Sequence, residues 1–289
     1  MRYPITFFFF FALMVSVSFA DQTTETLPSA SVPQQLQGFN LNGYGKDGEK
    51  TWDVNGTKAD ISDTNIKITN VDASFYGKEQ ANLTADHGTI DKANGNVHLQ
   101  DNVVVTSVER GTKMTTDTLD YNRNKDLVST KDPVKIVDEK GIMTGQGMVA
   151  HPNLKKAEIK KNVKARVHTQ SKDEPGDQIV TITSDGPMQM NQATMYAVFH
   201  DHVISVEPST GRELNCDKME IWFNQATKKI KKAICTGHAK SIQGTNVSYA
   251  DQMVYDGVTQ VLTMTGRPKL IFDTSKTKGN DMFKSKGKS

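Results

Sequence analysis

The chain contains one motif that returns six times at intervals of roughly thirty residues. Each copy opens on a small residue followed by an acidic residue or Gln146, and closes on a two-residue polar knuckle between apolar runs. The openings are Ala85-Asp86, Thr116-Asp117, Gly145-Gln146, Ser184-Asp185, Cys216-Asp217 and Ala250-Asp251. The knuckles are Asp101-Asn102, Asp132-Pro133, Lys161-Asn162, Asp201-His202, Gly237-His238 and Gly266-Arg267. A unit this short cannot bury its apolar face alone, so the copies must stack and share one interior.

The apolar residues within each copy alternate with polar ones, which predicts β-strands. Around the first knuckle, Val97 and Leu99 precede it and Val103 and Val105 follow it, each pair two residues apart. Alternate residues of a strand lie on the same face, so all four are expected to face the interior. The two-residue knuckle shifts the phase between them, which is typical of a corner or bulge. Since helical periodicity is nearly absent, the predicted fold class is all-β.

The same phase along the chain defines a candidate interior. Its members are Leu83, Val97, Leu99, Val103, Val105, Met114, Val134, Ile136, Met143, Ile159, Val163, Met188, Met195, Phe199, Val203, Met219, Ile221, Met253 and Met264. All nine methionines of residues 21–273 fall on this inward phase. Methionine lines adaptable apolar surfaces, but it also fills gaps in ordinary cores. The composition therefore leaves two alternatives, an apolar groove that accepts a ligand and a packed core.

The N-terminus has the pattern of an export signal. Arg2 precedes an apolar run from Ile5 to Phe19, and Ser18-Phe19-Ala20 forms a small-x-small cleavage site. We therefore interpret residues 1–20 as a signal peptide, with a retained inner-membrane anchor as the alternative. Residues 21–37, rich in Ser, Thr, Pro and Gln, are predicted to be a linker.

The spacing of the acidic openings divides the rest of the chain. Successive openings are 31, 29, 39, 32 and 34 residues apart, so the rhythm breaks once, after the third copy. This predicts a first β domain over residues 38–168, a linker over 169–178 and a second β domain over 179–273. The acidic residue at each opening is expected to accept hydrogen bonds from nearby backbone amides in a turn.

The charge is unevenly distributed along the chain. Residues 274–289 hold five lysines and one aspartate, and subtracting this tail and Arg2 from the formal charge of +2 leaves residues 21–273 near −3. An acidic body without a basic face or an aromatic platform argues against a nucleic-acid partner. The tail is predicted to be a solvated disordered terminus, and a tether to anionic head groups is the alternative.

Two cysteines in a chain with an export signal suggest a disulfide. Cys216 is the small residue before the acidic Asp217, and Cys235 lies just before the knuckle of the same repeat. Their phase places both on the inner face of neighbouring strands, so Cys216 and Cys235 are a candidate disulfide, with two buried free thiols as the alternative. No histidine is placed to activate either thiol for catalysis.

Other chemistry-bearing patterns are weak. His200 and His202 could share a strand face, but the neighbouring Phe199 and Val203 take the inward positions and leave both imidazoles at a solvent corner, so no metal site is predicted. No phosphate loop and no Ser/His/Asp order is found. We therefore predict neither an enzyme nor a cofactor. Trp52 and Trp222 are interpreted as packing or rim residues.

Several of these segments together resemble the LptC family of lipopolysaccharide export. The resemblance covers residues 38–168 and is carried by Asn82-Leu83-Thr84-Ala85-Asp86, Gly95-Asn96-Val97-His98-Leu99, Thr115-Thr116-Asp117-Thr118-Leu119, Ser129-Thr130-Lys131-Asp132-Pro133 and Gly145-Gln146-Gly147-Met148. Residues 180–273 are similar to the related OstA/LptA domain through Cys216-Asp217-Lys218-Met219 and Ala250-Asp251-Gln252-Met253. Each motif is short, but six in order with matching spacing are fairly specific.

The resemblance implies an open β-jellyroll, a V-shaped slot of antiparallel strands that shelters the acyl chains of lipopolysaccharide in the periplasm. It also implies partners: the inner-membrane LptB/LptF/LptG transporter at one end, and LptA or the LptD N-terminal domain at the other through edge-strand pairing. The inward residues would then be the lipid-binding residues. The alternative is a structural or interaction β-repeat protein of the cell envelope that carries no lipid.

Overall fold

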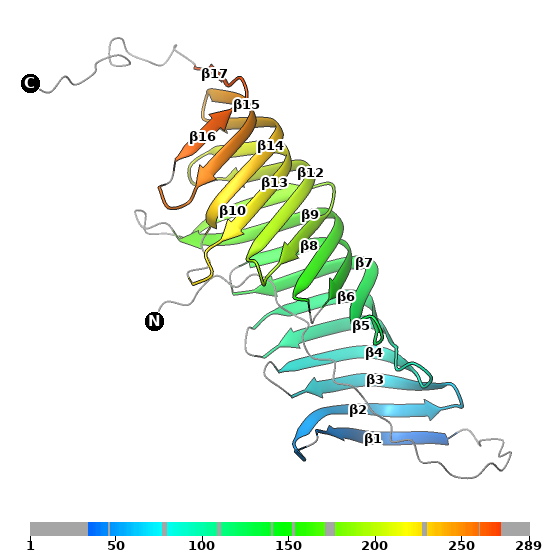
Figure 1. Cartoon of the computed structure of the whole chain (residues 1–289). Coiled ribbons are helices and arrows are strands. Elements are labelled where there is room, and N and C mark those ends of the chain that lie inside the picture. Colours follow the sequence, from blue (N-terminus) through cyan, green and yellow to red (C-terminus); the bar gives the residue numbers. More distant parts are fainter. Residues whose placement is uncertain are drawn as a thin grey trace, which may run out of the picture.

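The structure is a computed structural model that describes residues 34–45, 47–76, 80–108, 111–139, 141–151, 154–170, 177–226, 230–259 and 261–272. The predicted export signal and the basic tail lie outside the described residues. The described chain forms one antiparallel sheet of 17 strands that stack in sequence order into a long molecule (Figure 1). The prediction of an all-β fold of stacked repeats is therefore confirmed.

The strands are long and regular in both halves of the chain. The first half contains β1 (Gln34–Tyr44), β2 (Lys50–Ile61), β3 (Asn65–Phe75), β4 (Ala81–Asp91), β5 (Val97–Ser107), β6 (Lys113–Asn122), β7 (Leu127–Asp138), β8 (Gly141–His151) and β9 (Lys156–Gln170). The second half contains β10 (Asp177–Ser184), β11 (Met188–Asn191), β12 (Tyr196–Glu207), β13 (Arg212–Phe223), β14 (Ile230–Gln243), β15 (Asn246–Asp256), β16 (Leu262–Thr265) and β17 (Lys269–Ile271).

The sheet runs without a break through the position predicted to be a linker. Strand β9 extends to Gln170 and pairs with β10 from Asp177↔Gln170 to Ser184↔Val163. The same strand β9 also pairs with β11. Residues 169, 170, 177 and 178 are therefore strand, contrary to the prediction for 169–178. The break in sequence rhythm marks a longer hairpin within one sheet, because the pairing partner of a strand, not its spacing, decides whether the sheet continues.

The first strand also starts earlier than predicted. Strand β1 begins at Gln34, inside the segment 21–37 that was interpreted as a linker, and pairs with β2 from Gln34↔Ile61 onward. Its first residues are polar because they belong to an edge strand that is largely exposed. The polar composition of residues 34–37 is therefore why the start of β1 was interpreted as part of a linker.

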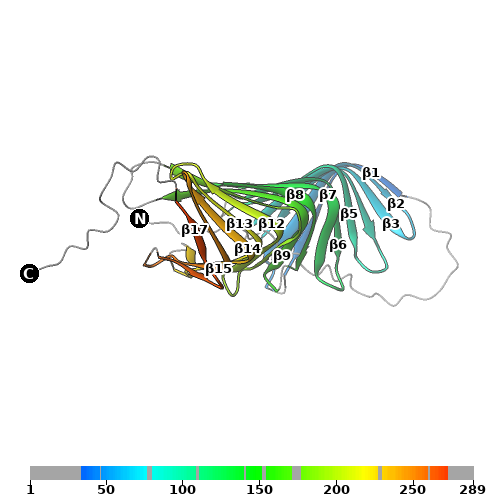
Figure 2. The ribbon, with the colours of Figure 1, turned by 90° about the horizontal axis from the view of Figure 1, so that it is seen from above.

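A line of β-bulges folds the sheet lengthwise. The register shifts at Thr84/His87, Gln100/Val103, Thr130/Pro133, His200/Val203, Asn215/Lys218 and Thr236/Ala239, among others, so that nearly every strand from β4 to β15 is bent at the same level. Asp101 and Asn102 have φ of 62° and 53°, and Asp201 and His202 have φ of 63° and 48°. Figure 2 shows the resulting curl of the sheet about its long axis. The prediction of a corner at the knuckles is confirmed.

The acidic openings hold the corners in a way that differs from the prediction. Asp86 accepts a hydrogen bond from the side chain of Asn102 at 2.7 Å, and Asp217 lies 2.8 Å from Nδ1 of His238. The carboxylates thus contact knuckle side chains of the next strand. Because the bulges of adjacent strands lie side by side, the two side chains are brought within reach across the sheet.

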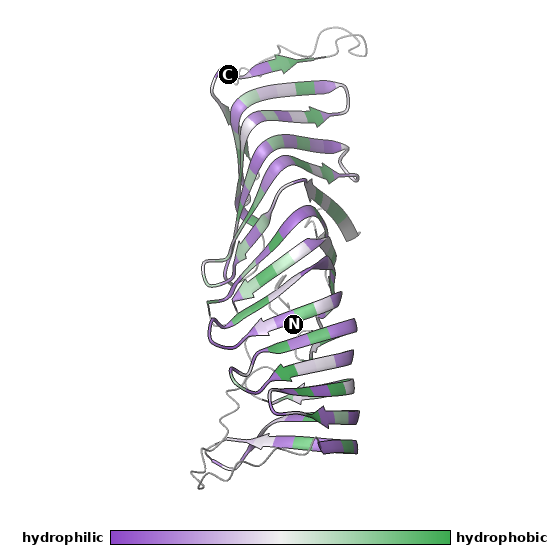
Figure 3. Cartoon of the chain, turned by 90° about the vertical axis from the view of Figure 1, so that its right-hand side faces the viewer, coloured by the Kyte–Doolittle hydropathy of each residue, from purple (hydrophilic) through white to green (hydrophobic). Residues whose placement is uncertain are grey.

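The inner and outer faces of the sheet differ in polarity. Apolar and polar residues alternate, as Figure 3 shows by hydropathy, and the apolar ones converge on a single buried cluster that extends from β2 to β15. A small residue at the bend of β8 lets the neighbouring strand β9 approach. At Gly145 a Cβ atom would overlap Cγ2 of Ile159 and lie 3.2 Å from the carbonyl oxygen of Lys161. Gly145 therefore faces the interior.

Gly145→Val should lower the free energy of unfolding by about 1–3 kcal/mol, because overpacking a closed interior displaces its neighbours. Thr144→Val is the matched control on the opposite face of the same strand and should change stability by less than about 0.5 kcal/mol. Urea unfolding followed by circular dichroism measures both. Equal stability of the two variants would contradict the inward placement of Gly145.

Asn102→Val should be less stable than Asn102→Gly by about 1–2 kcal/mol, because a β-branched residue is strained at positive φ and glycine is not. Both variants lose the hydrogen bond to Asp86, so the difference between them isolates the backbone. Thermal unfolding of the pair provides the measurement. If the two variants unfold at the same temperature, the left-handed knuckle is not what holds the bend.

Candidate functional site

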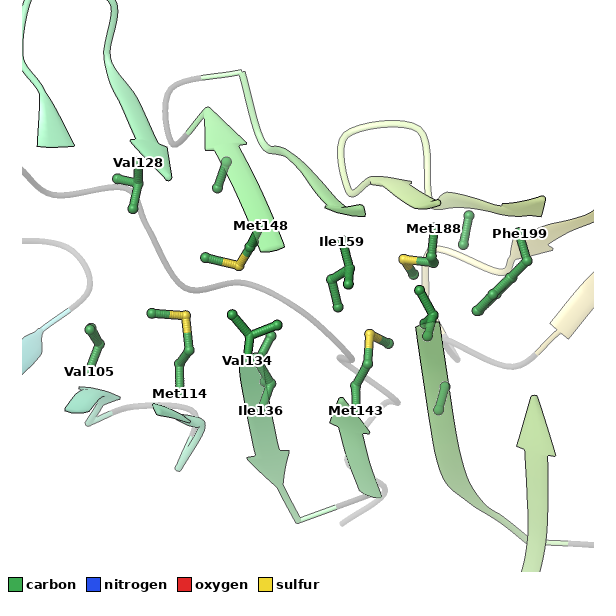
Figure 4. Packing of buried hydrophobic residues seen from close by; sticks show 14 of the residues in the cluster. Val105, Met114, Val128, Val134, Ile136, Met143, Met148, Ile159, Met188 and Phe199 are labelled. Atoms are coloured by element: carbon green, nitrogen blue, oxygen red, sulfur yellow. The ribbon is translucent and has the colours of Figure 1, made fainter. Parts of the chain in front are cut away.

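The candidate site is the interior enclosed by the two arms of the bent sheet, which we call the first and second walls. On the strands that carry a knuckle, the first wall holds the inward residues before the knuckle and the second wall holds those after it. Inward residues of the antiparallel neighbouring strands belong to the wall of the residue with which they pair. In Figure 4 the first-wall residues Val128, Met148, Ile159, Met188 and Phe199 face the second-wall residues Val105, Met114, Val134, Ile136 and Met143. Apolar side chains thus line both sides of one interior.

A continuous row of cross-strand partners runs along the first wall. Each member is paired in register with the next: Met148, Ile159, Met188, Phe199, Met219, Cys235, Met253 and Met264. The row starts on β8, crosses the predicted domain boundary between β9 and β11, and ends on β16. Methionine occupies five of these eight positions. The two halves of the chain therefore share one apolar surface, which the sequence alone left undecided.

The second wall changes chemistry along its length. From β4 to β10 its paired row is apolar and consists of Leu83, Val105, Met114, Ile136, Met143, Ala165 and Ile182. From β12 to β17 the row continues through Ser205, Leu214, Ser241, Ser248 and Leu270. Three of these five residues are serines, so this part of the wall is lined by smaller and more polar groups.

Most of the predicted interior residues are buried. The buried ones are Leu83, Leu99, Val103, Val105, Met114, Val134, Ile136, Met143, Ile159, Val163, Met188, Phe199, Val203, Met219, Ile221 and Met253. Val97 and Met264 are partly buried and pack against the same cluster. Met195 is different, because it lies in the turn between β11 and β12 with φ of 52°. Its inward strand position was predicted wrongly, since the turn interrupts the alternation.

Sequence reasoning missed the contribution of β2 and β3. Ala59, Ile68, Val71 and Ala73 are all buried in the same cluster. The signal was present, because Ile68 precedes Asn70 by two residues and Val71 follows it, as around the other knuckles. Asn70 has a left-handed φ of 55°. Strands β2 and β3 thus form a shortened copy of the repeat, with a one-residue knuckle at Asn70.

The interior becomes accessible toward the two ends of the sheet. Leu36 and Leu41 on β1 are 36% and 38% exposed, and Leu270 on β17 is 50% exposed. Among the described strands, β1 pairs only with β2, and β17 only with β15. Both ends of the molecule therefore present an apolar inner surface next to an unpaired strand edge, where a further strand can add to the sheet.

A few polar groups lie within the apolar interior. Ser107 Oγ and Thr112 Oγ1, at the outer end of the second wall, are buried and have no hydrogen-bond partner among the described residues. They follow Val105 and precede Met114 on the inward phase. Buried hydroxyls without a partner are unfavourable, so these two are available to a polar group that enters the interior.

Cys216 and Cys235 are both buried and both free thiols in the structure. A hydrogen bond from the Cys235 thiol, together with backbone amides of Thr236 and Lys218, lowers the pKa of Cys216 against the opposing effect of burial. The same hydrogen bond and burial raise the pKa of Cys235. The two thiols are thus in contact, as the predicted phase requires, and the disulfide between them remains a prediction.

The two tryptophans lie on opposite faces of the sheet. Trp52 lies over the backbone of Gly43 on the inner face of the first hairpin. Trp222 packs on the outer face against Tyr196, with ring centroids 5.1 Å apart. Burial and a 2.6 Å hydrogen bond to Glu220 raise the pKa of Tyr196 to about 12. Trp222 therefore belongs to an outer stabilising cluster and is far from any role in the interior.

Metal and membrane-spanning features are not found in the described part of the chain. No group of three metal-ligating side chains comes together there. His202 instead lies 3.0 Å from Asp185 at the corner, as one of the knuckle contacts. Within the described residues no helix has the length and hydropathy to cross a bilayer.

Comparison with known families accounts for nearly the whole chain. Residues 5–168 match the family "Lipopolysaccharide-assembly, LptC-related", and residues 181–287 match "LptA/(LptD N-terminal domain) LPS transport protein". A search of curated proteins finds no match. Domains of these families are typically periplasmic β-jellyrolls that transport lipopolysaccharide and are not enzymes, in agreement with the resemblance found in the sequence. The chain belongs to the LptC-related family of lipopolysaccharide-assembly proteins and continues into an LptA/LptD N-terminal domain, so it is a component of lipopolysaccharide transport.

Proposed function

We propose that the chain shelters the acyl chains of lipopolysaccharide between its two walls and passes them along its length, from the first domain to the second. The observation that carries this proposal is the row of paired residues from Met148 to Met264, which crosses the domain boundary without interruption. A lipid that moves along such a row meets an apolar surface at every step and does not have to enter water between the domains.

The energetics favour a continuous shelter. Each buried methylene contributes about 0.8 kcal/mol, so one chain of twelve to fourteen carbons represents roughly 10 kcal/mol of apolar hydration. A gap between domains would expose much of the acyl chain's apolar surface to water at once. A row of closely similar apolar sites instead divides the movement of the lipid into small steps.

The methionine content supports an interior that can rearrange. The inward residues are buried in the structure, so side chains or walls must move to admit an acyl chain. Methionine is unbranched and adopts many rotamers at little cost, and its thioether is polarisable. Five methionines in the first-wall row therefore provide a surface that can repack around a guest more easily than branched residues can.

The polar lining supports the orientation of the lipid. Ser107 and Thr112 at the end of the second wall have hydroxyls without a partner among the described residues. These hydroxyls can donate to the carbonyl oxygens that link acyl chains to the sugar. The sugars themselves would then project into water beyond the lip of the wall.

The proposed partners follow from the two ends of the sheet. We infer that the end at β1 receives lipid from the inner-membrane LptB/LptF/LptG transporter, which would also supply the energy. The end at β17 would pair with a further LptA or with the LptD N-terminal domain. The unpaired edges and the exposed Leu36, Leu41 and Leu270 support this reading. Residues 1–20 would direct export to the periplasm, with or without a retained inner-membrane anchor.

Photocrosslinking in living cells tests the path. A photoreactive amino acid at Leu99, Phe199 or Met253 should give lipopolysaccharide adducts, because all three side chains are buried in the interior. Outward His98 and Glu220, on neighbouring strand positions, should give none. Adducts at Leu99 alone would confine the lipid to the first domain. Absence of adducts at all three inward sites, with each variant folded, would favour a structural repeat without cargo.

Met188→Glu should interrupt the path at the domain boundary, because a charge in an apolar interior is costly to desolvate. Adducts at Met253 should fall about tenfold, while those at Leu99 remain, since Leu99 lies upstream of the block. Met188→Leu and the outward Gln189→Glu serve as controls and should keep both adducts. Circular dichroism checks that each variant folds. Unchanged adducts at Met253 in a folded Met188→Glu variant would rule out a path along the first-wall row.

A further inference from the structure

The two cysteines lie at the same bulge, one on β13 and one on β14. Cys216 lies on β13 in the second wall and pairs with Val203 of β12. Cys235 lies on β14 in the first-wall row, between Met219 and Met253. Pairing of β13 with β14 is interrupted between Asn215↔Lys240 and Lys218↔Thr236; Cys216 lies within this interruption and Cys235 is the first residue beyond Thr236. The two thiols therefore meet at the corner where the walls join.

The two thiols interact directly in the folded chain. Its Sγ accepts hydrogen bonds from the thiol of Cys235 and from the backbone amides of Thr236 and Lys218. These donors favour the thiolate and lower the pKa of Cys216, whereas Cys235 has its pKa raised and keeps its proton. The two sulfur atoms are therefore side by side in the folded chain, which is the proximity that a disulfide between them requires.

We propose that Cys216 and Cys235 form a disulfide that ties the two walls together at the corner between β13 and β14. The oxidant is a disulfide, either of an exported thiol oxidoreductase or of oxidised glutathione. The thiolate of Cys216 attacks one sulfur of that disulfide and releases the other as a thiol. Cys235 then loses its proton and attacks Sγ of Cys216, which expels the second thiol of the oxidant. Two protein thiols are oxidised, and one disulfide is reduced to two thiols that carry the two protons.

Burial sets the time at which the bond forms. Cys216 and Cys235 are 5% and 3% exposed, so a protein oxidant cannot reach them once the sheet has closed. Oxidation therefore takes place while β14 is still adding to β13. The same burial protects the finished bond from reductants, which makes it a permanent structural link and not a reversible switch.

The bond would reinforce a corner that is otherwise held by polar contacts. At the same bulge, Asp217 lies 2.8 Å from Nδ1 of the exposed His238. Other corners depend on such contacts alone, for example Asp86 with Asn102. A covalent link at this corner fixes the angle between the walls in the second domain, while the first domain remains free to widen. This inference does not depend on the lipid cargo proposed above.

The test is the oxidation state of the full chain purified from the periplasm of a bacterial host without reductant. The protein is denatured in N-ethylmaleimide and its intact mass is measured. We expect no maleimide adduct on the monomer, and two adducts when the chain is denatured and reduced before the alkylation. Peptide mapping should recover Cys216 linked to Cys235. Two adducts without reductant, or a disulfide-linked dimer, would overturn the proposal.

The variants Cys216→Ser and Cys235→Ser distinguish the effect of the disulfide from the effect of replacing a cysteine side chain. Each should carry one adduct with or without reductant. Reduction of the wild-type chain in denaturant, followed by refolding with reductant present, should lower its melting temperature by several degrees, because the ring between the two positions is released in the unfolded state. The same treatment should leave both variants unchanged. If the variants fold poorly, the wild-type comparison with and without reductant still decides the question. An equal melting temperature in both conditions would contradict a stabilising bond.

Discussion

The bend in the sheet is the constraint on which the rest of the molecule depends. A flat antiparallel sheet of this length would expose one apolar face to water. Bending each strand at the same level lets that face close on itself, but it also requires the side-chain phase to change at the bend. The paired bulges and the left-handed residues such as Asp101 and Asn102 provide this change. Because every strand bends in step with its neighbours, one corner stabilises the next through contacts such as that of Asp86 with Asn102.

The shared bend also explains how two sequence domains make one interior. The inward residues keep their register from strand to strand, so the row that includes Ile159 and Met188 passes from the first domain into the second. A domain boundary in sequence thus corresponds to a long hairpin and not to a gap in the sheet. The change on the second wall, from residues like Met143 to residues like Ser241, is then a gradient within one surface.

Much of this architecture could be predicted from the sequence, because its causes are local. A phase shift between apolar pairs locates each knuckle in the sequence. The inward positions of residues such as Val103 and Val203 can be predicted from that shift. Two features depended on strand pairing that the sequence does not reveal. The sheet is continuous because β9 pairs with β10, and Asp217 contacts His238 on the next strand. Met195 was misplaced for a local reason, because a turn interrupts the alternation there. The one-residue knuckle at Asn70 had a signal that was overlooked.

The central claim is that a single apolar interior spans both domains and receives the lipid. A structure of the full chain with bound lipopolysaccharide, determined by crystallography or electron microscopy, tests it most directly. We predict acyl-chain density between the two walls, against Met148 and Ile159 in one domain or Met219 and Met253 in the other, with the sheet unbroken between them. Density for lipid only on the outer face, or a break in the sheet between β9 and β10, would contradict the account.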